Sequence, residues 1–234
     1  MLPVLFAAFL RIAAADPAAD LSRAADPTLP EAARMEAFNR LVSAGTNDLR
    51  ALRAAAADAS GDSRRRWVAI RALGKVGGTG PRDTLLQLLN DPQPAVRAAA
   101  AQALGDLGDR TVHTALVPAL QDPAVIVRAA AAEALGKVGD ANAVPALAAA
   151  FTARDGWYRG SSLWVRRHYV VALGQIGDRS AIPTLRSALD DADTAVQAAA
   201  VGAFEALAGF DYRQGRSLAE QKDAWRRWAG AQGG

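Results

Sequence analysis

Two histidines, His113 and His168, are the only imidazole groups in this chain of 234 residues, and cysteine is absent. A thiolate nucleophile, a disulfide and a cysteine-rich metal site are therefore excluded. Neither histidine has a carboxylate partner at a fixed sequence offset, as a metal site or a catalytic triad would require. His113 stands where equivalent segments carry Val or Ile, which predicts half-buried packing. We therefore expect no catalytic residue, no metal site and no cofactor.

A short segment from Thr152 to Trp164, TARDGWYRGSSLW, concentrates aromatic residues in a chain that is otherwise poor in them. Trp, Tyr and Arg dominate the energetics of protein interfaces, so this segment predicts a partner-binding patch. The alternative is that one of the two tryptophans folds back and covers a gap between structural units. The predicted patch consists of Arg154, Trp157, Tyr158, Arg159, Trp164 and Arg167.

An arginine recurs along the chain at intervals that match a repeat: Arg66, Arg97, Arg128 and Arg166. A nucleic-acid interface is one interpretation. The regular spacing instead favours a ladder in which each arginine meets an aspartate or a carbonyl of an adjoining unit, because stacked repeats need recurrent interface residues. The formal net charge of +3 is small, so it permits acidic partners without requiring them.

The elements that position these residues are repeated helical hairpins. Leu73, Leu104 and Leu135 are spaced by 31 residues, Leu173 follows after 38, and Phe204 after another 31. Such a period indicates a solenoid, whose units bury their apolar faces only by stacking. The one longer interval contains the aromatic segment, and insertions in repeat proteins map to loops.

Each unit is predicted to hold two helices with recognisable ends. We expect the aspartate of the Asp-Pro pairs to cap the first helix, with proline at its first position. Those pairs are Asp91-Pro92 and Asp122-Pro123. Pro118 should distort a second helix. A glycine near the end of each first helix should let the two helices of a pair touch; these are Gly74, Gly105, Gly136 and Gly174.

The two ends of the chain depart from the repeat, as terminal units of solenoids do. Near the C-terminus, Ser217 is predicted to cap a final helix in which Trp225 and Trp228 seal the last apolar face. Residues 1–15 contain an apolar run that is too short to span a bilayer, followed by small residues. This pattern indicates either a signal peptide, with export to the periplasm, or an apolar first helix of a cytoplasmic protein. Residues 16–29 are predicted to be irregular.

The predicted fold is all-α: a right-handed α-solenoid of about six stacked helical hairpins with a C-terminal capping helix. The single repeat domain covers residues 30–234. Its predicted parts are a degenerate unit at 30–60, clear units at 61–90, 91–121, 122–151, 161–190 and 191–210, an insertion at 152–160 and a cap at 211–234.

The pattern DPxxxVRxxAAxALGxxGDxxAVPAL, over residues 60–210 and weakly over 30–60, resembles the short HEAT-like repeat of the bilin-lyase type. These units are shorter than ordinary HEAT repeats of about 40–47 residues. The resemblance implies the solenoid fold, but it is shared by scaffolds, chaperone-like proteins, bilin lyases and many bacterial proteins. HEAT-repeat hydroxylases carry His-Glu dipeptides, and this chain has none.

Three functions remain open from the sequence. The first is a non-enzymatic scaffold, a monomer that binds a protein partner on a concave surface formed by the second helices and on the aromatic loop. The second is a bilin-lyase-like factor that handles a tetrapyrrole on a partner protein. The third, a helical-repeat DNA glycosylase, would need a strongly basic groove, and the balanced charge argues against it, so we expect no nucleic-acid partner.

Overall fold

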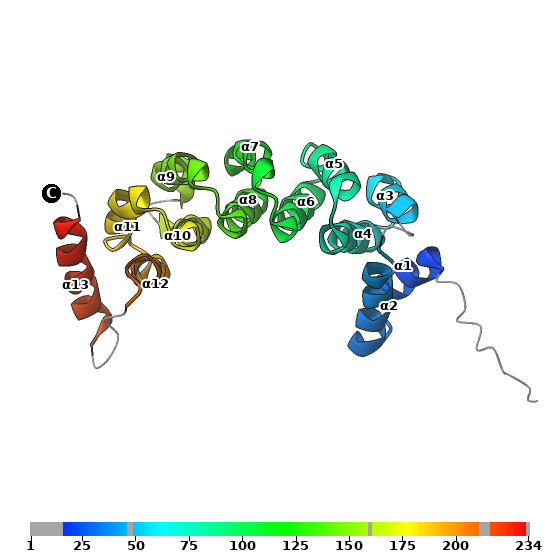
Figure 1. The fold of residues 1–234 in the computed structure, drawn as a ribbon, viewed down its shortest axis with the longest axis horizontal. Helices are drawn as coiled ribbons and strands as arrows, with labels where there is room; N and C mark the ends of the chain where they lie inside the picture. The colour runs from blue at the N-terminus through cyan, green and yellow to red at the C-terminus, as the bar shows by residue number, and fades with distance from the viewer. Residues whose placement is uncertain (1–15, 46–48, 159–160, 211–215, 233–234) are drawn as a thin grey trace, which may run out of the picture.

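The computed structural model describes residues 16–45, 49–158, 161–210 and 216–232. Within this part of the chain, almost every segment is helical, and the helices form an arch (Figure 1). Two rows of helices follow the arch, an inner row and an outer row, and a helix projects inward at each end (Figure 1). The predicted right-handed α-solenoid of stacked hairpins is confirmed.

The inner row consists of the first helix of each unit, and the outer row consists of the second helices (Figure 1). The inner helices are α4 (Ser63–Val76), α6 (Pro94–Leu107), α8 (Val125–Val138), α10 (Val165–Ile176) and α12 (Thr194–Ala208). The outer helices are α3 (Leu49–Ala57), α5 (Thr79–Leu88), α7 (His113–Leu116), α9 (Val144–Thr152) and α11 (Ile182–Ala188). The remaining helices, near the two ends, are α1 (Pro17–Ala25), α2 (Glu31–Ser43) and α13 (Leu218–Ala231).

Successive inner helices approach one another closely because a glycine of one helix faces an alanine of the next. A Cβ atom placed on Gly105 would lie 2.6 Å from the Cα of Ala134, and one on Gly74 would lie 2.8 Å from the Cβ of Ala103. Gly136 and Gly174 meet alanines of α10 and α12 in the same way. These glycines were predicted to join the two helices of one hairpin. They instead join neighbouring units, so the prediction of close approach holds but the partner was wrong.

This contact explains why the first helices line the concave side. The row with the smaller spacing must lie on the inside of a curved stack, and small residues permit that spacing. The outer helices are built around larger residues, such as the buried Leu85, Leu116 and Leu147. The second helices, which were predicted to line the concave surface, lie on the outer side of the arch, so that prediction was wrong (Figure 1).

The turn inside the hairpin of α6 and α7 is formed by a glycine and an aspartate. Gly108 ends α6 in the left-handed conformation, with φ of 66°, where a side chain would be strained. Asp109 then accepts hydrogen bonds from the backbone and hydroxyl of Thr111, so it caps the following turn. Pro118 interrupts the second helix as expected, because α7 ends at Leu116 and Pro118–Gln121 form a separate 3₁₀ turn.

Three of the four recurrent arginines form the predicted ladder between units, and Arg128 donates hydrogen bonds to the carbonyl oxygens of Asp122 and Pro123 at the start of its own unit. Arg66 pairs with Asp91 at 2.6 Å, and Arg97 holds both carboxylate oxygens of Asp122 at 2.7 and 2.8 Å. Arg166 pairs with Asp191 at 2.6 Å. The hydrogen bonds from Arg97 hold the pKa of the Asp122 carboxyl below its ordinary value. Breaking such a buried pair leaves an uncompensated charge, so the ladder fixes the register between units.

The same aspartates do not cap helices, which corrects the predicted role of the Asp-Pro pairs. Helix α6 begins at Pro94, two residues after Pro92, and Gln93 precedes it as the N-cap. Asp91 accepts a hydrogen bond from the backbone of Gln93 and forms a turn before the helix. The carboxylate is thereby oriented toward the arginine of the preceding unit, a long-range contact that local helix rules do not reveal.

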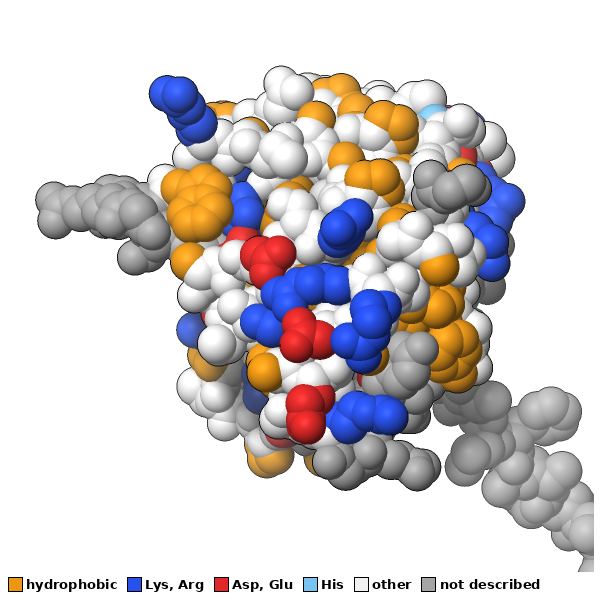
Figure 2. Space-filling view, turned by 90° about the vertical axis from the view of Figure 1, so that its left-hand side faces the viewer, with side chains coloured by type: hydrophobic (Ala, Val, Ile, Leu, Met, Phe, Trp, Pro, Cys, Tyr) orange, Lys and Arg blue, Asp and Glu red, His pale blue; other side chains and the backbone are white. Residues whose placement is uncertain are grey.

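The ends of the arch are closed by helices that differ from the repeat. At the C-terminal end, Ser217 and Glu220 form a capping box at the start of α13, as the serine predicted. Trp225 is fully buried and stacks on Phe204 at a centroid distance of 5.6 Å, so it seals the last apolar face. Basic and acidic side chains cover the outward surface at this end (Figure 2), which suits a terminal unit in contact with water.

The N-terminal lead-in is more ordered than predicted. Asp16 accepts hydrogen bonds from the backbones of Ala18 and Ala19 and caps α1, so Pro17 takes the first helical position. The prediction of an irregular segment at 16–29 was therefore wrong for α1, because its Asp-Pro start and Ala-rich body favour a helix. The predicted signal peptide at 1–15 lies outside the described residues. None of the described helices combines the length and apolarity that a membrane crossing requires.

Replacing Gly105 by alanine should destabilise the stack, because the new methyl group would overlap the backbone of Ala134. Overpacking of this kind costs about 1–3 kcal/mol. Gly80→Ala is the matched control, because a Cβ there meets no atom within 4 Å, and alanine favours a helix by up to about 1 kcal/mol over glycine. Urea unfolding followed by circular dichroism measures both variants. Equal unfolding midpoints would show that the glycine contact does not set the spacing.

Candidate functional site

The inner surface of the arch is formed by the side of each inner helix that no neighbour covers. On α4 four exposed side chains, Arg64, Trp67, Arg71 and Lys75, follow one stripe, because residues three and four apart share a helix face. The 31-residue period aligns Arg64 with Ala95 of α6 and Ile126 of α8, and the insertion shifts the next equivalent to Trp164. We call these exposed side chains of α4, α6, α8 and α10 the inner face.

Three large apolar side chains are exposed on the inner face. Trp67 is 45% exposed, Ile126 51% and Trp164 47%. Between them the helices carry small side chains, namely Ala95, Ala98, Ala99, Ala129 and Ala130. The surface is therefore an apolar track whose floor consists of alanines. Exposed large apolar groups that share one surface mark interaction sites more often than single ones do.

The acidic groups of the inner face are already engaged. Asp106 lies between Lys75 at 2.9 Å and Lys137 at 2.7 Å, so one carboxylate links three units. Partial burial opposes ionisation of Asp106, but the hydrogen bonds from both lysines outweigh it and lower the pKa of its carboxyl. Glu133 of α8 lies 3.1 Å from the Nε2 atom of His168 of α10.

Not all basic groups of the inner face form ion pairs. The guanidinium of Arg71 lies over the Trp67 ring at 4.7 Å and over the Phe38 ring of α2 at 5.7 Å. Within the described part of the chain, Arg64, Arg71 and Arg167 have no ion-pair partner, in contrast to the arginines of the ladder. The uncompensated charge of the inner face is therefore positive.

The aromatic loop between α9 and α10 forms a short 3₁₀ turn and a two-residue antiparallel pair, β1 (Trp157–Tyr158) with β2 (Ser161–Ser162). Trp157 lies over the guanidinium of Arg166 at 4.3 Å, and Phe151 lies over the same group at 4.0 Å. The buried Arg166 of the ladder is thus enclosed by two aromatic rings. The sequence left open that one of the two tryptophans folds back and covers a gap between units. Trp157 is placed in this way.

The six residues of the predicted patch separate into different environments. Trp164 and Arg167 lie on α10 and its N-cap and belong to the inner face. Arg154 is exposed in the 3₁₀ turn before the strands. Arg159 lies outside the described residues, and so does the side chain of Tyr158. Trp157 remains 37% exposed beside its contact with Arg166.

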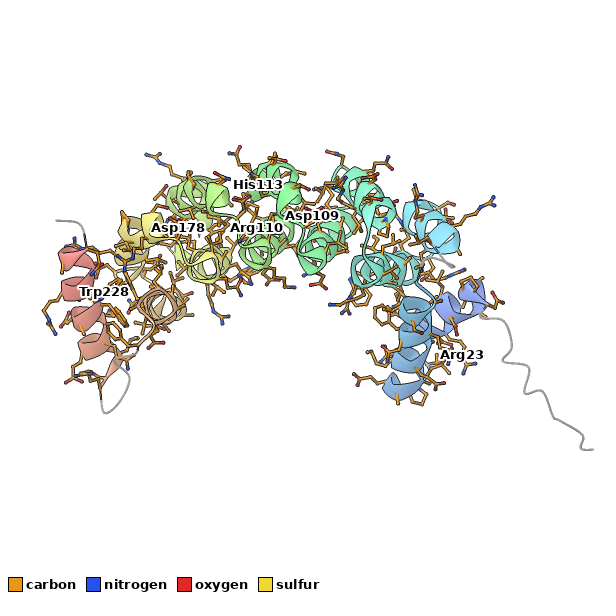
Figure 3. The ribbon with its side chains drawn as sticks, in the orientation of Figure 1. Arg23, Asp109, Arg110, His113, Asp178 and Trp228 are labelled. Carbon is orange, nitrogen blue, oxygen red and sulfur yellow. The ribbon has the colours of Figure 1, made fainter. Side chains whose placement is uncertain are left out.

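Both histidines have a carboxylate neighbour in space, although neither has one at a fixed sequence offset. His113 Nδ1 lies 2.9 Å from a carboxylate oxygen of Asp140 in the next unit, and it is half-buried on the outer side of the arch (Figure 3). His168 is paired with Glu133 and packs edge-on against Trp164 at a centroid distance of 4.9 Å. The partners come from neighbouring units, so no local sequence offset indicates them. No group of three metal-ligating side chains occurs among the described residues.

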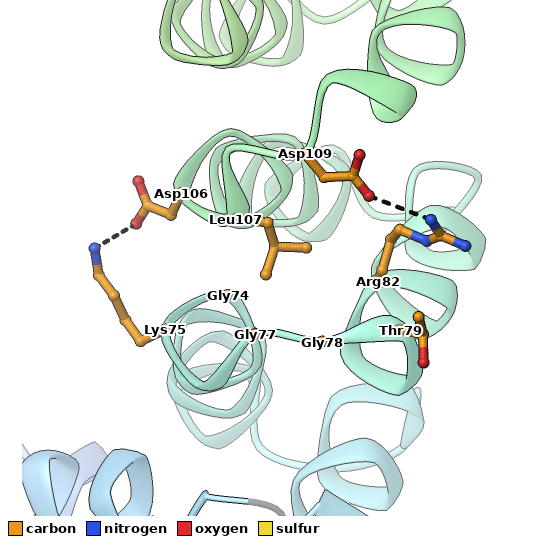
Figure 4. A pocket seen from close by; sticks show the side chains of 9 residues that line it. All are labelled: Gly74, Lys75, Gly77, Gly78, Thr79, Arg82, Asp106, Leu107 and Asp109. Carbon is orange, nitrogen blue, oxygen red and sulfur yellow. Dashed lines mark hydrogen bonds and ion pairs between the residues drawn. The ribbon is translucent and has the colours of Figure 1, made fainter.

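A hollow of about 290 Å³ lies beside the turn Gly77-Gly78-Thr79 (Figure 4). Its two cations are each paired with a carboxylate of the next unit, Lys75 with Asp106 and Arg82 with Asp109, the latter at 3.2 Å. The glycine-rich turn lacks the Lys and Ser/Thr that follow a phosphate-binding loop. The hollow is therefore a gap between two stacked units, and its charged side chains hold those units together.

Sequence reasoning missed Trp67 and Ile126 as candidate binding residues. Trp67 directly follows three arginines, Arg64-Arg65-Arg66, and Ile126 resembles one more apolar residue of a repeat. Alignment of the units supplies the missing signal. Ile126 aligns with Arg64 and Ala95, and Trp67 aligns with Ala98 and Ala129, so neither large side chain is required by the packing of the repeat.

Two rows of stacked helical hairpins, joined by a recurrent arginine–aspartate ladder, define an α-solenoid. The sequence matches the HEAT repeats family over residues 55–125, 82–164 and 158–229. The chain therefore belongs to the HEAT repeat family, and the resemblance to HEAT-like repeats is confirmed. It matches no protein with a curated description.

Solved structures of repeat proteins are similar to it. A HEAT-like repeats protein from the archaeon Thermococcus onnurineus aligns with a TM-score of 0.53 at 15% identity, over 93% of this chain and 98% of that one. A Kap121p mutant aligns with a TM-score of 0.58 at 16% identity, over 82% of this chain and 25% of that one. The complex of CpcE and CpcF of phycocyanin lyase from a Nostoc species aligns with 0.44 at 22% identity, over 97% and 100%. Similarity at this level shows the fold alone.

The two tryptophans of the loop region should differ in their effect on stability. Trp157→Ala removes a ring from the buried Arg166, and a desolvated cation–π contact contributes about 2 kcal/mol. Trp164→Ala removes one edge-on ring contact at an exposed position and should cost less than about 1 kcal/mol. Chemical denaturation of both variants gives the comparison. A larger loss for Trp164→Ala would contradict the environments described above.

Proposed function

We propose that this chain is a non-enzymatic interaction protein that binds a protein partner on its inner face, together with the adjoining loop at 152–164. The observation that carries the proposal is the exposure of Trp67, Ile126 and Trp164 on one concave surface. Tryptophan is enriched among residues that contribute most to binding energy, especially where it is surrounded by contacts that exclude water. A concave surface provides such surroundings when a partner fills it.

The rigidity of the arch supports the same proposal. The glycine–alanine contacts and the arginine–aspartate ladder fix each unit against the next, so the exposed side chains are held at defined positions before a partner arrives. A preorganised surface loses less conformational entropy on binding than a mobile one does. The contacts of Arg71 with Trp67 and of His168 with Trp164 also restrain the two tryptophans.

The catalytic alternatives have less support from the described residues. The imidazoles of His113 and His168 each face a single carboxylate, and no nucleophile adjoins either pair among the hydrogen bonds of the described chain. A DNA glycosylase would require a dense basic groove, whereas Asp106 and Glu133 lie on the inner face. No observation specifically favours tetrapyrrole handling.

Affinity capture from an extract of the native host tests the proposed function. The bait is the full chain, compared with a Trp67→Ala/Trp164→Ala double variant. The matched control is Gln87→Ala/Arg186→Ala, which truncates two exposed side chains of the outer helices α5 and α11. We expect the inner-face variant to lose a captured protein that the control variant retains. Capture of the same proteins by both variants would show that the inner face is not the binding surface.

A further inference from the structure

On the inner face the carboxylates lie beside basic side chains, whereas three arginines have no ion pair within the described residues. Its two carboxylates, Asp106 and Glu133, each lie within ion-pair distance of a basic partner on a neighbouring helix. Its three arginines, Arg64, Arg71 and Arg167, have no ion pair within the described residues. A partner that approaches this surface therefore meets three guanidinium groups without an ion pair in the described part of the chain, whereas each carboxylate already faces a basic side chain of a neighbouring helix. Complementary charge favours a negatively charged partner.

An apolar socket lies beside these arginines. A hollow of about 210 Å³ separates the N-terminal halves of α4 and α6, and its walls include Arg64, Trp67, Ala95 and Ala99. A second hollow of about 250 Å³ lies between α8 and α10, and its walls include Arg167, Glu133 and His168. Each hollow therefore places an exposed arginine at the edge of a space that a side chain can enter.

We propose that the partner segment bound by the inner face is acidic and carries spaced apolar side chains; this inference rests on the proposed function above. One apolar side chain of the segment enters the hollow beside Trp67, and others contact Ile126 and Trp164. Carboxylates of the segment bind Arg64 and Arg71 at one end of the track and Arg167 at the other. The arginines thus select an acidic segment, and the apolar groups hold it.

The span of the track sets the size of the segment. Packed helices lie about 8–10 Å apart, so the three steps from α4 to α10 cover roughly 24–30 Å. A helical segment of about 16–20 residues spans this length at a rise of 1.5 Å per residue. An extended segment needs about 8 residues at roughly 3.3 Å each.

A peptide fits the inner face better than a single-stranded nucleic acid does. Nucleic acids bind to a continuous basic groove in which aromatic rings stack on successive bases. Here the two exposed tryptophans are three helices apart, and an aliphatic Ile126 and an alanine floor lie between them. Charge at the two ends of an apolar track matches a polypeptide with separated carboxylates.

Fluorescence anisotropy with labelled synthetic peptides tests this inference. The probe is an 18-residue peptide with leucine at helical spacing of three and four and glutamate at the other positions. It is compared with the same peptide carrying lysine in place of glutamate, with a peptide carrying serine in place of leucine, and with a 12-nucleotide oligo(dT). We expect the Glu/Leu peptide to bind about tenfold more tightly than each of the others, and less tightly at higher salt.

Charge reversal localises the effect. Arg64→Glu/Arg167→Glu should weaken binding of the Glu/Leu peptide about tenfold or more and improve binding of the Lys/Leu peptide. Arg50→Glu/Arg186→Glu changes the net charge equally on the outer helices α3 and α11, where both arginines are exposed, and should leave the preference intact. Absence of peptide binding, tighter binding of the oligonucleotide or the Lys/Leu peptide, or equal effects of the two double variants would overturn the inference.

The two proposals fail separately. If capture from the host extract depends on Trp67 and Trp164 but the peptides show no acidic preference, the inner face binds proteins and only the stated chemistry is wrong. If the capture experiment shows no dependence on either tryptophan, the proposed function itself is wrong.

Discussion

The close contact between a glycine of one inner helix and an alanine of the next is the constraint on which the rest of this structure depends. It recurs at four successive junctions, from Gly74 to Gly174. Because side chains are nearly absent at the contact, the backbones approach and the inner row is shorter than the outer row. The stack must then curve toward the inner row. The identity of the concave surface, and hence the exposed candidates on it, follows from this contact.

The ladder and the loop add a second level of order. An isolated buried arginine would be costly, but each ladder arginine reaches a carboxylate or carbonyl oxygens near the start of a unit. At the insertion, two aromatic rings enclose Arg166 in addition to its aspartate. The insertion therefore contributes to stacking through Trp157 and to the inner face through Trp164. One segment of sequence thus places its two tryptophans in different surroundings, one against Arg166 and one on the inner face.

Much of the fold could be predicted from the sequence because the repeat is regular. The 31-residue period, the break at Pro118 and the arginine ladder are local or periodic signals, and the structure bears them out. The partners of Gly105 and Asp91 were misassigned because helix-capping rules concern neighbours in sequence, whereas these residues contact the adjacent unit. The concave surface was misassigned because curvature depends on the relative spacing of two rows. Trp67 was overlooked because its exposure is visible only when units are aligned and stacked.

Distances between spin labels test the central claim most directly, and the absence of cysteine from the chain means that labels attach only where cysteine is introduced. The pair Lys75→Cys/Lys137→Cys joins exposed sites on inner helices two units apart, and Gln87→Cys/Ala149→Cys joins exposed sites on outer helices the same number of units apart. Pulsed electron paramagnetic resonance reports both separations. The arch predicts a shorter distance for the inner pair. An equal or longer inner distance would mean that the first helices do not line a concave surface, and the binding face inferred from them would be lost.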